Sequence, residues 1–231
     1  MTDRLDRASV VALTLTAAYF TFGVLRVRAH QELGTPANDI YAYVYPASVY
    51  AWRAIRDGAG LFWNPYQDCG QPFFAVSQTG LLYPVNLVFF FLDREPALLA
   101  SVWINLAIAG AGAFLLGRSM GLGVAAALCG ALAFQLAGYT VQLAAWTPIH
   151  IATYAWMPVV LWRTERLVKE PSVRGGIWLG LVITLQHLPV EFTVSVQVEF
   201  EPRALAANLV HEALRFTWER KASCWGPGSN L

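Results

Sequence analysis

Residues 97–117 read ALLASVWINLAIAGAGAFLLG, a stretch without a single charged side chain. A helix of about 20 apolar residues crosses the ~30 Å hydrocarbon core of a lipid bilayer. Apolar stretches that could form further spans lie on either side of it, at 8–25, 122–146, 148–162 and 175–188. The pattern predicts an all-α protein whose residues 1–190 form a polytopic bundle of transmembrane helices.

The composition supports this class. Of the 231 residues, 56% are hydrophobic and only 13% are charged, and the mean hydropathy is +0.45. Soluble domains carry about twice that fraction of charge. The predicted partner is therefore the lipid bilayer, and a net charge of +1 gives no electrostatic basis for binding nucleic acid. Cys69, Cys129 and Cys224 are too far apart along the chain to suggest a metal-ligand motif.

One long polar segment, residues 26–80, interrupts the apolar stretches and is predicted to be a loop. Within it, residues 46–57 have the pattern of a short helix, with Pro46 at its start and Gly58 after its end. That helix could lie along the membrane interface or pack on protein. Residues 81–92 are apolar but too short for a normal span and contain Pro84 and Asn86, so we expect a re-entrant or interfacial segment that does not cross.

The charges in short loops predict the orientation, because basic residues are enriched in loops on the cytoplasmic side. The basic cluster between the last two apolar stretches comprises Arg163, Arg166, Lys169 and Arg174. Placing this cluster inside puts the N-terminus inside and residues 26–80 outside, provided that 81–92 does not cross. After Glu191 charge rises and apolar periodicity ends, so residues 191–231 are expected to form a polar tail, as in a truncated or frameshifted reading frame.

Two acidic residues of the long loop are candidates for chemistry. Asp39 follows Asn38 shortly after the first apolar stretch, and a carboxylate near a membrane surface can act as a general base or hold a cation. The alternative for Asp39 is a solvated loop acid or a helix cap. Asp68 could bracket the same site, or it could bond its own backbone in a turn.

Aromatic and amide side chains of the same loop suit sugar recognition, by stacking and by hydrogen bonding. The alternative for the aromatic residues is the belt that marks the headgroup level of membrane proteins. His150, at an outer helix end, could face the same compartment as Asp39. The candidate substrate-binding residues are Asp68, Trp63, Asn64, Tyr66, Gln78 and His150. Phe73 and Tyr83 are two further aromatic residues suited to stacking on a sugar. The sequence contains no Walker loop, dinucleotide fingerprint, zinc spacing or serine-nucleophile elbow.

The order of these motifs resembles a known family. The resemblance rests on Asn38-Asp39, Tyr45-Pro46, Leu61-Phe62-Trp63-Asn64-Pro65-Tyr66, Gly70-Gln71-Pro72-Phe73, Gln78, Tyr83-Pro84-Val85-Asn86 and Trp156-Met157-Pro158. Over residues 8–190 the chain resembles the YfhO-type bacterial membrane proteins, which belong with the GT-C class of polytopic glycosyltransferases.

This resemblance implies transfer of a sugar from a polyprenyl-phosphate donor to an acceptor at the outer face of the bacterial cytoplasmic membrane. It also implies that Asp39 is the catalytic base. The cofactor stays open, because either a divalent metal or a cationic side chain could stabilise the leaving phosphate. Family members are much longer, so the chain is interpreted as an N-terminal fragment, and a truncated chain is expected to be inactive. The competing class is a non-enzymatic or transporter-like membrane protein with an external binding loop. The lack of charge in the middle of the main spans weighs against a transporter.

Overall fold

The computed structural model describes residues 2–25, 45–67, 69–75, 80–92, 94–146 and 148–189. Helices make up the fold, and within the described ranges the only strand-like pairing is a single bridge between Asn64 and Gln71. The predicted all-α class is therefore confirmed. The predicted polar tail, residues 191–231, lies outside the described residues, as does the segment 26–44.

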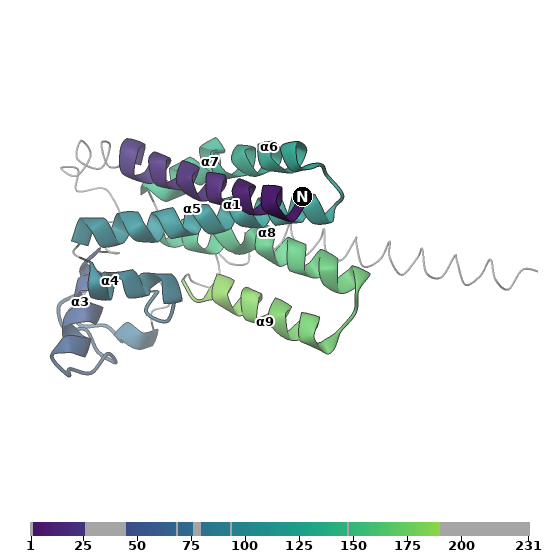
Figure 1. Ribbon diagram of the computed structural model, residues 1–231. Helices are drawn as coiled ribbons and strands as arrows, with labels where there is room; N and C mark the ends of the chain where they lie inside the picture. Colours follow the sequence, from purple (N-terminus) through teal and green to yellow (C-terminus); the bar gives the residue numbers. More distant parts are fainter. Residues whose placement is uncertain are drawn as a thin grey trace, which may run out of the picture.

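The central element is α5, Arg94–Ser119, which contains the uncharged stretch quoted above. Around it pack α1 (Thr2–Ala18), α6 (Val124–Gln135) and α8 (Pro148–Lys169), and α9 (Val173–His187) packs on α8 (Figure 1). Small residues of α5 allow this close packing. A Cβ atom at Gly112 would lie 2.6 Å from the Cγ2 atom of Val159 in α8.

Several helices differ in length from the apolar stretches that predicted them. The first continues from α1 into a π-helical segment, η1 (Tyr19–Leu25), and α8 extends to Lys169, past Pro158, which does not end it. The stretch 122–146, expected to be one span, is broken into α6 and α7 (Gly138–Trp146), which meet at 44°. The Thr140 hydroxyl donates to the Phe134 carbonyl oxygen at 2.8 Å, so a side chain satisfies a carbonyl beside the break.

By length and composition, one described helix could cross a membrane, the Pro96–Ser119 part of α5. The bent pair of α6 and α7 would be a second if the two together form one span. The apolar residues 81–92 form two short helical pieces, η5 (Pro84–Leu87) and α4 (Val88–Phe91). Together with α3 (Tyr45–Arg56), they lie at the end of the bundle where α5 begins (Figure 1).

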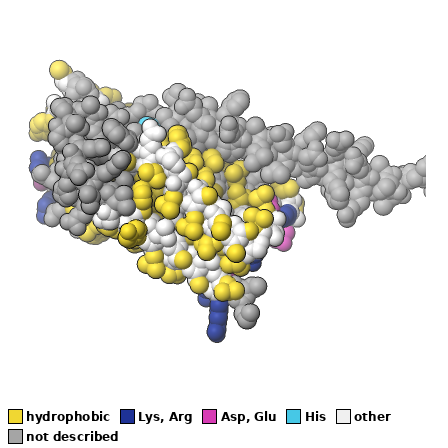
Figure 2. Space-filling view, turned by 90° about the horizontal axis from the view of Figure 1, so that it is seen from above, with side chains coloured by type: hydrophobic (Ala, Val, Ile, Leu, Met, Phe, Trp, Pro, Cys, Tyr) yellow, Lys and Arg dark blue, Asp and Glu magenta, His cyan; other side chains and the backbone are white. Residues whose placement is uncertain are grey.

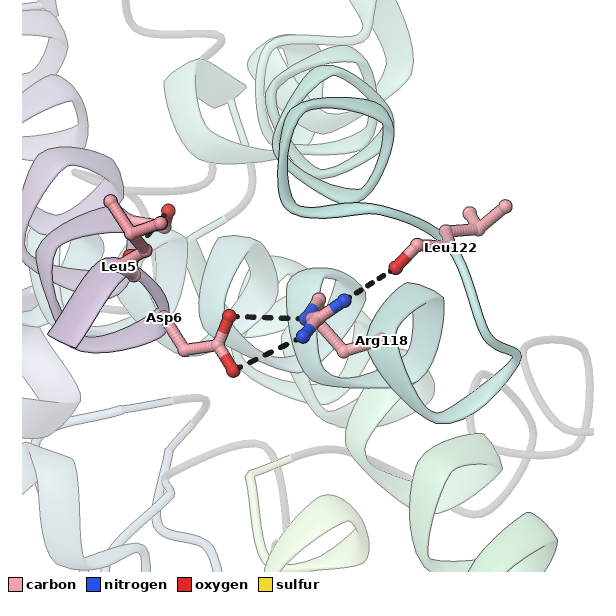
Figure 3. Close-up of polar contacts among 5 residues, drawn as sticks. Leu5, Asp6, Arg118 and Leu122 are labelled. Carbon is pink, nitrogen blue, oxygen red and sulfur yellow. Dashed lines mark hydrogen bonds and ion pairs between the residues drawn. The ribbon is translucent and has the colours of Figure 1, made fainter. Parts of the chain in front are cut away.

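Ion pairs join the helices at the opposite end of the bundle. Arg118, near the end of α5, binds the carboxylate of Asp6 in α1 at 3.0 Å and the Leu122 carbonyl oxygen at 2.6 Å (Figure 3). In α8, Lys169 pairs with Glu165 at 2.7 Å, and its Nζ donates to the Ser119 carbonyl oxygen at 2.6 Å. The start of α1, the end of α5 and the end of α8 are thus held together.

Candidate functional site

The described residues 57–67 and 69–75, which follow α3, form a loop that carries Trp63, Asn64 and Tyr66. Asn64 and Gln71 exchange two backbone hydrogen bonds, at 2.9 and 3.0 Å, which close the loop. Asn64 is only 2% exposed, and its Oδ1 accepts the backbone N–H of Tyr66 at 3.0 Å. The hydroxyl of Tyr50, in α3, donates to the Trp63 carbonyl oxygen at 2.6 Å. Asn64 therefore shapes the turn that presents its two aromatic neighbours.

Gly70 fits against the indole of Trp63. Its φ is +107°, and a Cβ atom at this position would lie 2.6 Å from Cζ2 of the Trp63 ring. Cys69, just before it, also has a positive φ, of 60°. These two residues turn the chain back beneath the indole of Trp63, and only Cys69 carries the strain of a side chain at positive φ.

The loop exposes aromatic rings. Tyr66 is 87% exposed, Phe62 77% and Trp63 56%, and Phe62 also packs against the half-exposed Phe74, with ring centroids 5.8 Å apart. Phe73, by contrast, is fully buried against Tyr50, with ring centroids 4.8 Å apart. Trp63 and Tyr66 can therefore offer ring faces to a ligand, whereas Phe73 supports the loop from below.

Two side-chain amide atoms of the same loop are buried and have no hydrogen-bond partner in the part of the chain that the structure describes. They are the Oε1 atom of Gln67, an acceptor, and the Nε2 atom of Gln71, a donor. Buried polar atoms are normally paired, so such atoms call for a physical explanation. A ligand hydroxyl can both donate and accept, and one that reached these atoms would satisfy either of them.

A second polar cluster connects this end of the bundle to the central helices. The Tyr83 hydroxyl donates to Asn105 Oδ1 in α5 at 2.5 Å and accepts from Trp156 Nε1 in α8 at 2.9 Å. Burial raises the pKa of the Tyr83 hydroxyl, so it remains protonated and keeps donating at any physiological pH. Tyr83 is therefore a structural clamp and is not available for stacking against a ligand.

The clamp continues toward the loop through Asn86. Its Nδ2 donates to the Gly80 carbonyl oxygen at 3.0 Å, and its Oδ1 accepts from the Ser101 hydroxyl at 3.4 Å. Asn105 Nδ2 in turn donates to the Ser101 carbonyl oxygen at 2.9 Å. Asn105 was not among the residues predicted from the sequence. Its signal was an amide inside an otherwise apolar span, where polar side chains usually face protein.

The remaining predicted site residues are placed as follows. His150 lies partly buried in the first turn of α8. Asp39, Asp68 and Gln78 lie outside the described residues. Within the described ranges, no three histidine, cysteine or acidic side chains lie close enough together to hold a metal ion.

The structure thus brings Trp63, Asn64 and Tyr66 together in one loop, with the amides of Gln67 and Gln71 beside them. The exposed rings can stack on a polar ligand with a flat apolar face, and the two unpaired amide atoms are buried in the same loop. In comparisons with known proteins, no family model, no curated protein and no solved structure matches this chain.

Proposed function

We propose that this chain is a multi-pass protein of the bacterial cytoplasmic membrane with its N-terminus inside. The supporting observation is an inverted distribution of polarity. In a soluble protein, large apolar side chains are mostly buried and polar ones mostly exposed. In a membrane bundle, the outer surface meets lipid, and polar side chains turn toward protein.

The outer surface of the helices is apolar. In α1 and η1 the exposed positions Val11, Leu15 and Tyr19 follow one another at helical spacing, and Leu15 is 64% exposed. On α9, Ile177 is 68% exposed and Leu181 is also exposed. Figure 2 shows the face where α1, α6 and α7 lie, with hydrophobic side chains spread over it and charged side chains at its margins. An apolar surface of this kind marks contact with lipid or protein.

The interior contains uncharged polar side chains. Gln135 in α6 is fully buried, and its Nε2 donates to carbonyl oxygens of two other helices, those of Leu13 at 3.2 Å and Leu106 at 2.9 Å. Such interhelical amides are characteristic of membrane bundles, where no water competes for them. The other fully or nearly fully buried polar residues of the helices are Thr21, Asn105, Thr140, Thr153 and Gln186.

The ends of the bundle differ in charge. The basic side chains near the ends of α5 and α8 and the start of α9 lie at the end where α1 begins. The aromatic loop, the described part of residues 57–75 with the exposed rings of Trp63 and Tyr66, lies at the other end (Figure 1). The enrichment of basic residues on the cytoplasmic side supports an inside position for the first end. The loop that carries Trp63 and Tyr66 is then outside.

We further infer that the outer end binds a lipid-linked sugar and takes part in its transfer to an extracytoplasmic acceptor. The observation that carries this inference is the position of the exposed Trp63 and Tyr66 rings beside the unpaired amides of Gln67 and Gln71. In the proposed reaction the acceptor hydroxyl oxygen attacks the anomeric carbon, and the bond from that carbon to the phosphate oxygen breaks. Polyprenyl phosphate leaves, and Asp39 takes the hydroxyl proton.

Transfer can be measured in membranes that contain a longer protein carrying this same loop, because a truncated chain by itself is expected to be inactive. The donors would be polyprenyl phosphates carrying radiolabelled glucose, mannose or N-acetylglucosamine, and the readout would be label that moves from lipid into non-lipid products. Asp39→Asn keeps the shape of the side chain and removes the base, so transfer should fall about a hundredfold or more. Trp63→Ala should weaken donor binding.

Asp57→Asn is the matched control, because Asp57 is an exposed acid of the same loop region, and it should leave transfer unchanged. Absence of transfer from all three donors, or full transfer by Asp39→Asn, would contradict the catalytic proposal. Retention of the donors without transfer would instead favour the non-enzymatic alternative, a membrane protein with an external binding loop.

A further inference from the structure

A cavity of about 450 Å³ lies between the end of α8 and the start of α9, at the end of the bundle opposite the aromatic loop. The short turn between these helices contains Pro171 and Ser172, and the Ser172 hydroxyl accepts the Gly175 N–H at 3.1 Å. The cavity is lined by Arg163, Arg166, Leu167, Glu170, Ser172, Arg174, Gly175 and Trp178.

The charge in this cavity is positive and locally uncompensated. Two other cations at this end have acidic partners, since Arg118 binds Asp6 and Lys169 binds Glu165. The structure records no ion pair for the three arginines of the cavity within its described residues, and Glu170 is the only acid in the lining. Three guanidinium groups around one cavity favour an anion with several oxygen atoms.

Aromatic rings hold one of these guanidinium groups in place. The Cζ atom of Arg163 lies 4.4 Å from the centre of the Trp162 ring and 5.6 Å from that of Trp178. Its Nε atom is buried and has no acceptor among the described residues. A freely solvated arginine would direct its donors into water, whereas this one keeps a donor out of water beside a cavity.

The surface next to the cavity is apolar. Trp178 belongs to the cavity lining and is also partly exposed, and Ile177 and Leu181 continue the exposed apolar surface along α9. The arginines of the cavity suit the phosphate group of a ligand, and the apolar surface of α9 suits its long hydrocarbon chains. A free phosphate or nucleotide would use the arginines alone.

We propose that this cavity binds the phosphate of an anionic phospholipid of the inner leaflet, with the acyl chains lying along the exposed face of α9. The guanidinium groups of Arg163, Arg166 and Arg174 donate to the phosphate oxygens, and Trp178 contacts the glycerol and upper chain region. Basic cavities between helices on the cytoplasmic side are suited to anionic lipid headgroups. This inference rests on the proposed membrane insertion but is independent of the sugar-transfer proposal.

Binding can be measured on the whole chain purified in a nonionic detergent. The probe would be dioctanoylphosphatidylglycerol, with dioctanoylphosphatidylcholine as the zwitterionic comparison, and the readouts would be lipid retained in native mass spectra and the shift in unfolding temperature. We expect dioctanoylphosphatidylglycerol to bind, and we expect its binding to weaken as ionic strength rises. Replacing two phosphate-binding arginines, in Arg163→Gln/Arg166→Gln, should raise its Kd about tenfold or more.

Arg53→Gln/Arg56→Gln is a closely matched control, because it also removes two arginines three positions apart on a helix. Arg56 likewise stacks on a tryptophan, with its Cζ atom 5.6 Å from the Trp52 ring centre, but at the other end of the molecule. This control should keep the wild-type Kd. Arg163→Lys/Arg166→Lys, which keeps the charge and loses the planar donors, should bind with intermediate strength and guards against misfolding of the glutamine variant.

Equal binding of the two lipids, or equal loss in the Arg163/Arg166 and Arg53/Arg56 variants, would overturn the proposal. Displacement of the lipid by millimolar inorganic phosphate, with the same thermal shift from phosphate alone, would assign the cavity to free phosphate and overturn the lipid assignment. Asp39→Asn should leave lipid binding intact, so failure of the sugar-transfer proposal and failure of this one give different results.

Discussion

Gly70 is the residue on which the shape of the aromatic loop depends most directly. Two constraints act on it at once: a φ of +107°, which disfavours any side chain, and the Trp63 ring, which occupies the space of a Cβ atom. The two glycines that follow α3 carry only one constraint or none. Gly58 has a φ of +66° with no atom near its Cβ position, and Gly60 has open space around it.

These differences predict a graded series of alanine variants. Gly70→Ala should destabilise the loop by about 1–3 kcal/mol, through backbone strain and displacement of the indole. Gly58→Ala should cost only the strain of its positive φ, about 1–2 kcal/mol. Gly60→Ala should be neutral. Hydrogen–deuterium exchange of peptides covering residues 57–75 measures the effect locally, and equal exchange in Gly70→Ala and Gly60→Ala would show that the indole is not held as described.

At the scale of elements, the contact among α1, α5 and α6 centres on Gln135. Its Nε2 bridges carbonyl oxygens of α1 and α5, and it can do so because Gly110 of α5 leaves room. A Cβ atom at Gly110 would lie 2.6 Å from that Nε2 atom. Because the amide is fully buried and donates to both helices, it cannot move aside without losing these bonds.

A double-mutant cycle tests this arrangement. Gly110→Ala should destabilise the protein in detergent by about 1–3 kcal/mol, because it overpacks the contact. Gln135→Ala should cost about 1–2 kcal/mol, through loss of the interhelical hydrogen bonds. The double variant should lose less stability than the two single variants together, because Gln135→Ala removes the atom that clashes with the new Cβ atom of Gly110→Ala.

Gly130→Ala provides the control for this cycle, because Gly130 is also in α6 but has no neighbour within 4 Å of its Cβ position. It should change stability little. The unfolding free energy of each variant can be measured by steric trapping or by thermal denaturation in detergent. Strict additivity of Gly110→Ala and Gln135→Ala would contradict the proposed contact.

At the scale of the whole molecule, lipid insertion and orientation predict a distinctive reactivity of three cysteines. Cys69 and Cys129 are both exposed in the protein alone. Cys69 lies in the aromatic loop and should react with a membrane-impermeant maleimide added to intact cells. Cys129 lies on α6, where lipid should cover it, so it should react only after detergent is added. A cysteine placed at the exposed Val173 should react only when the inner side is opened.

Each measurement would use a variant with a single cysteine, so that Cys224 is replaced by serine throughout. Equal labelling of Cys69 and Cys129 in intact membranes would indicate that α6 faces water and would contradict insertion. Labelling of the cysteine at position 173 from outside, with Cys69 protected, would reverse the orientation and remove the basis for an external site.

Helix class and helix positions were predictable, because they depend on residues close together in the chain. An uncharged stretch such as 97–117 favours a helix whatever surrounds it. Pro46 and Gly58 correctly predicted a short helix between them, which is α3, Tyr45–Arg56. The break between α6 and α7 was not predicted. The apolar stretch is continuous there, and the Thr140 hydroxyl that satisfies the Phe134 carbonyl oxygen acts only once the chain has bent.

The candidate site divides in the same way. Composition was enough to select Trp63, Asn64 and Tyr66 as a group, but it could not separate the buried turn-former Asn64 from the exposed rings. Nor could it pair Tyr83 with Asn105 and Trp156, which lie 22 and 73 residues further along the chain. Such pairs, like the arginines around the cavity between α8 and α9, come together only when the helices pack. Long-range packing therefore decides which polar groups are satisfied inside the protein and which are left unpaired.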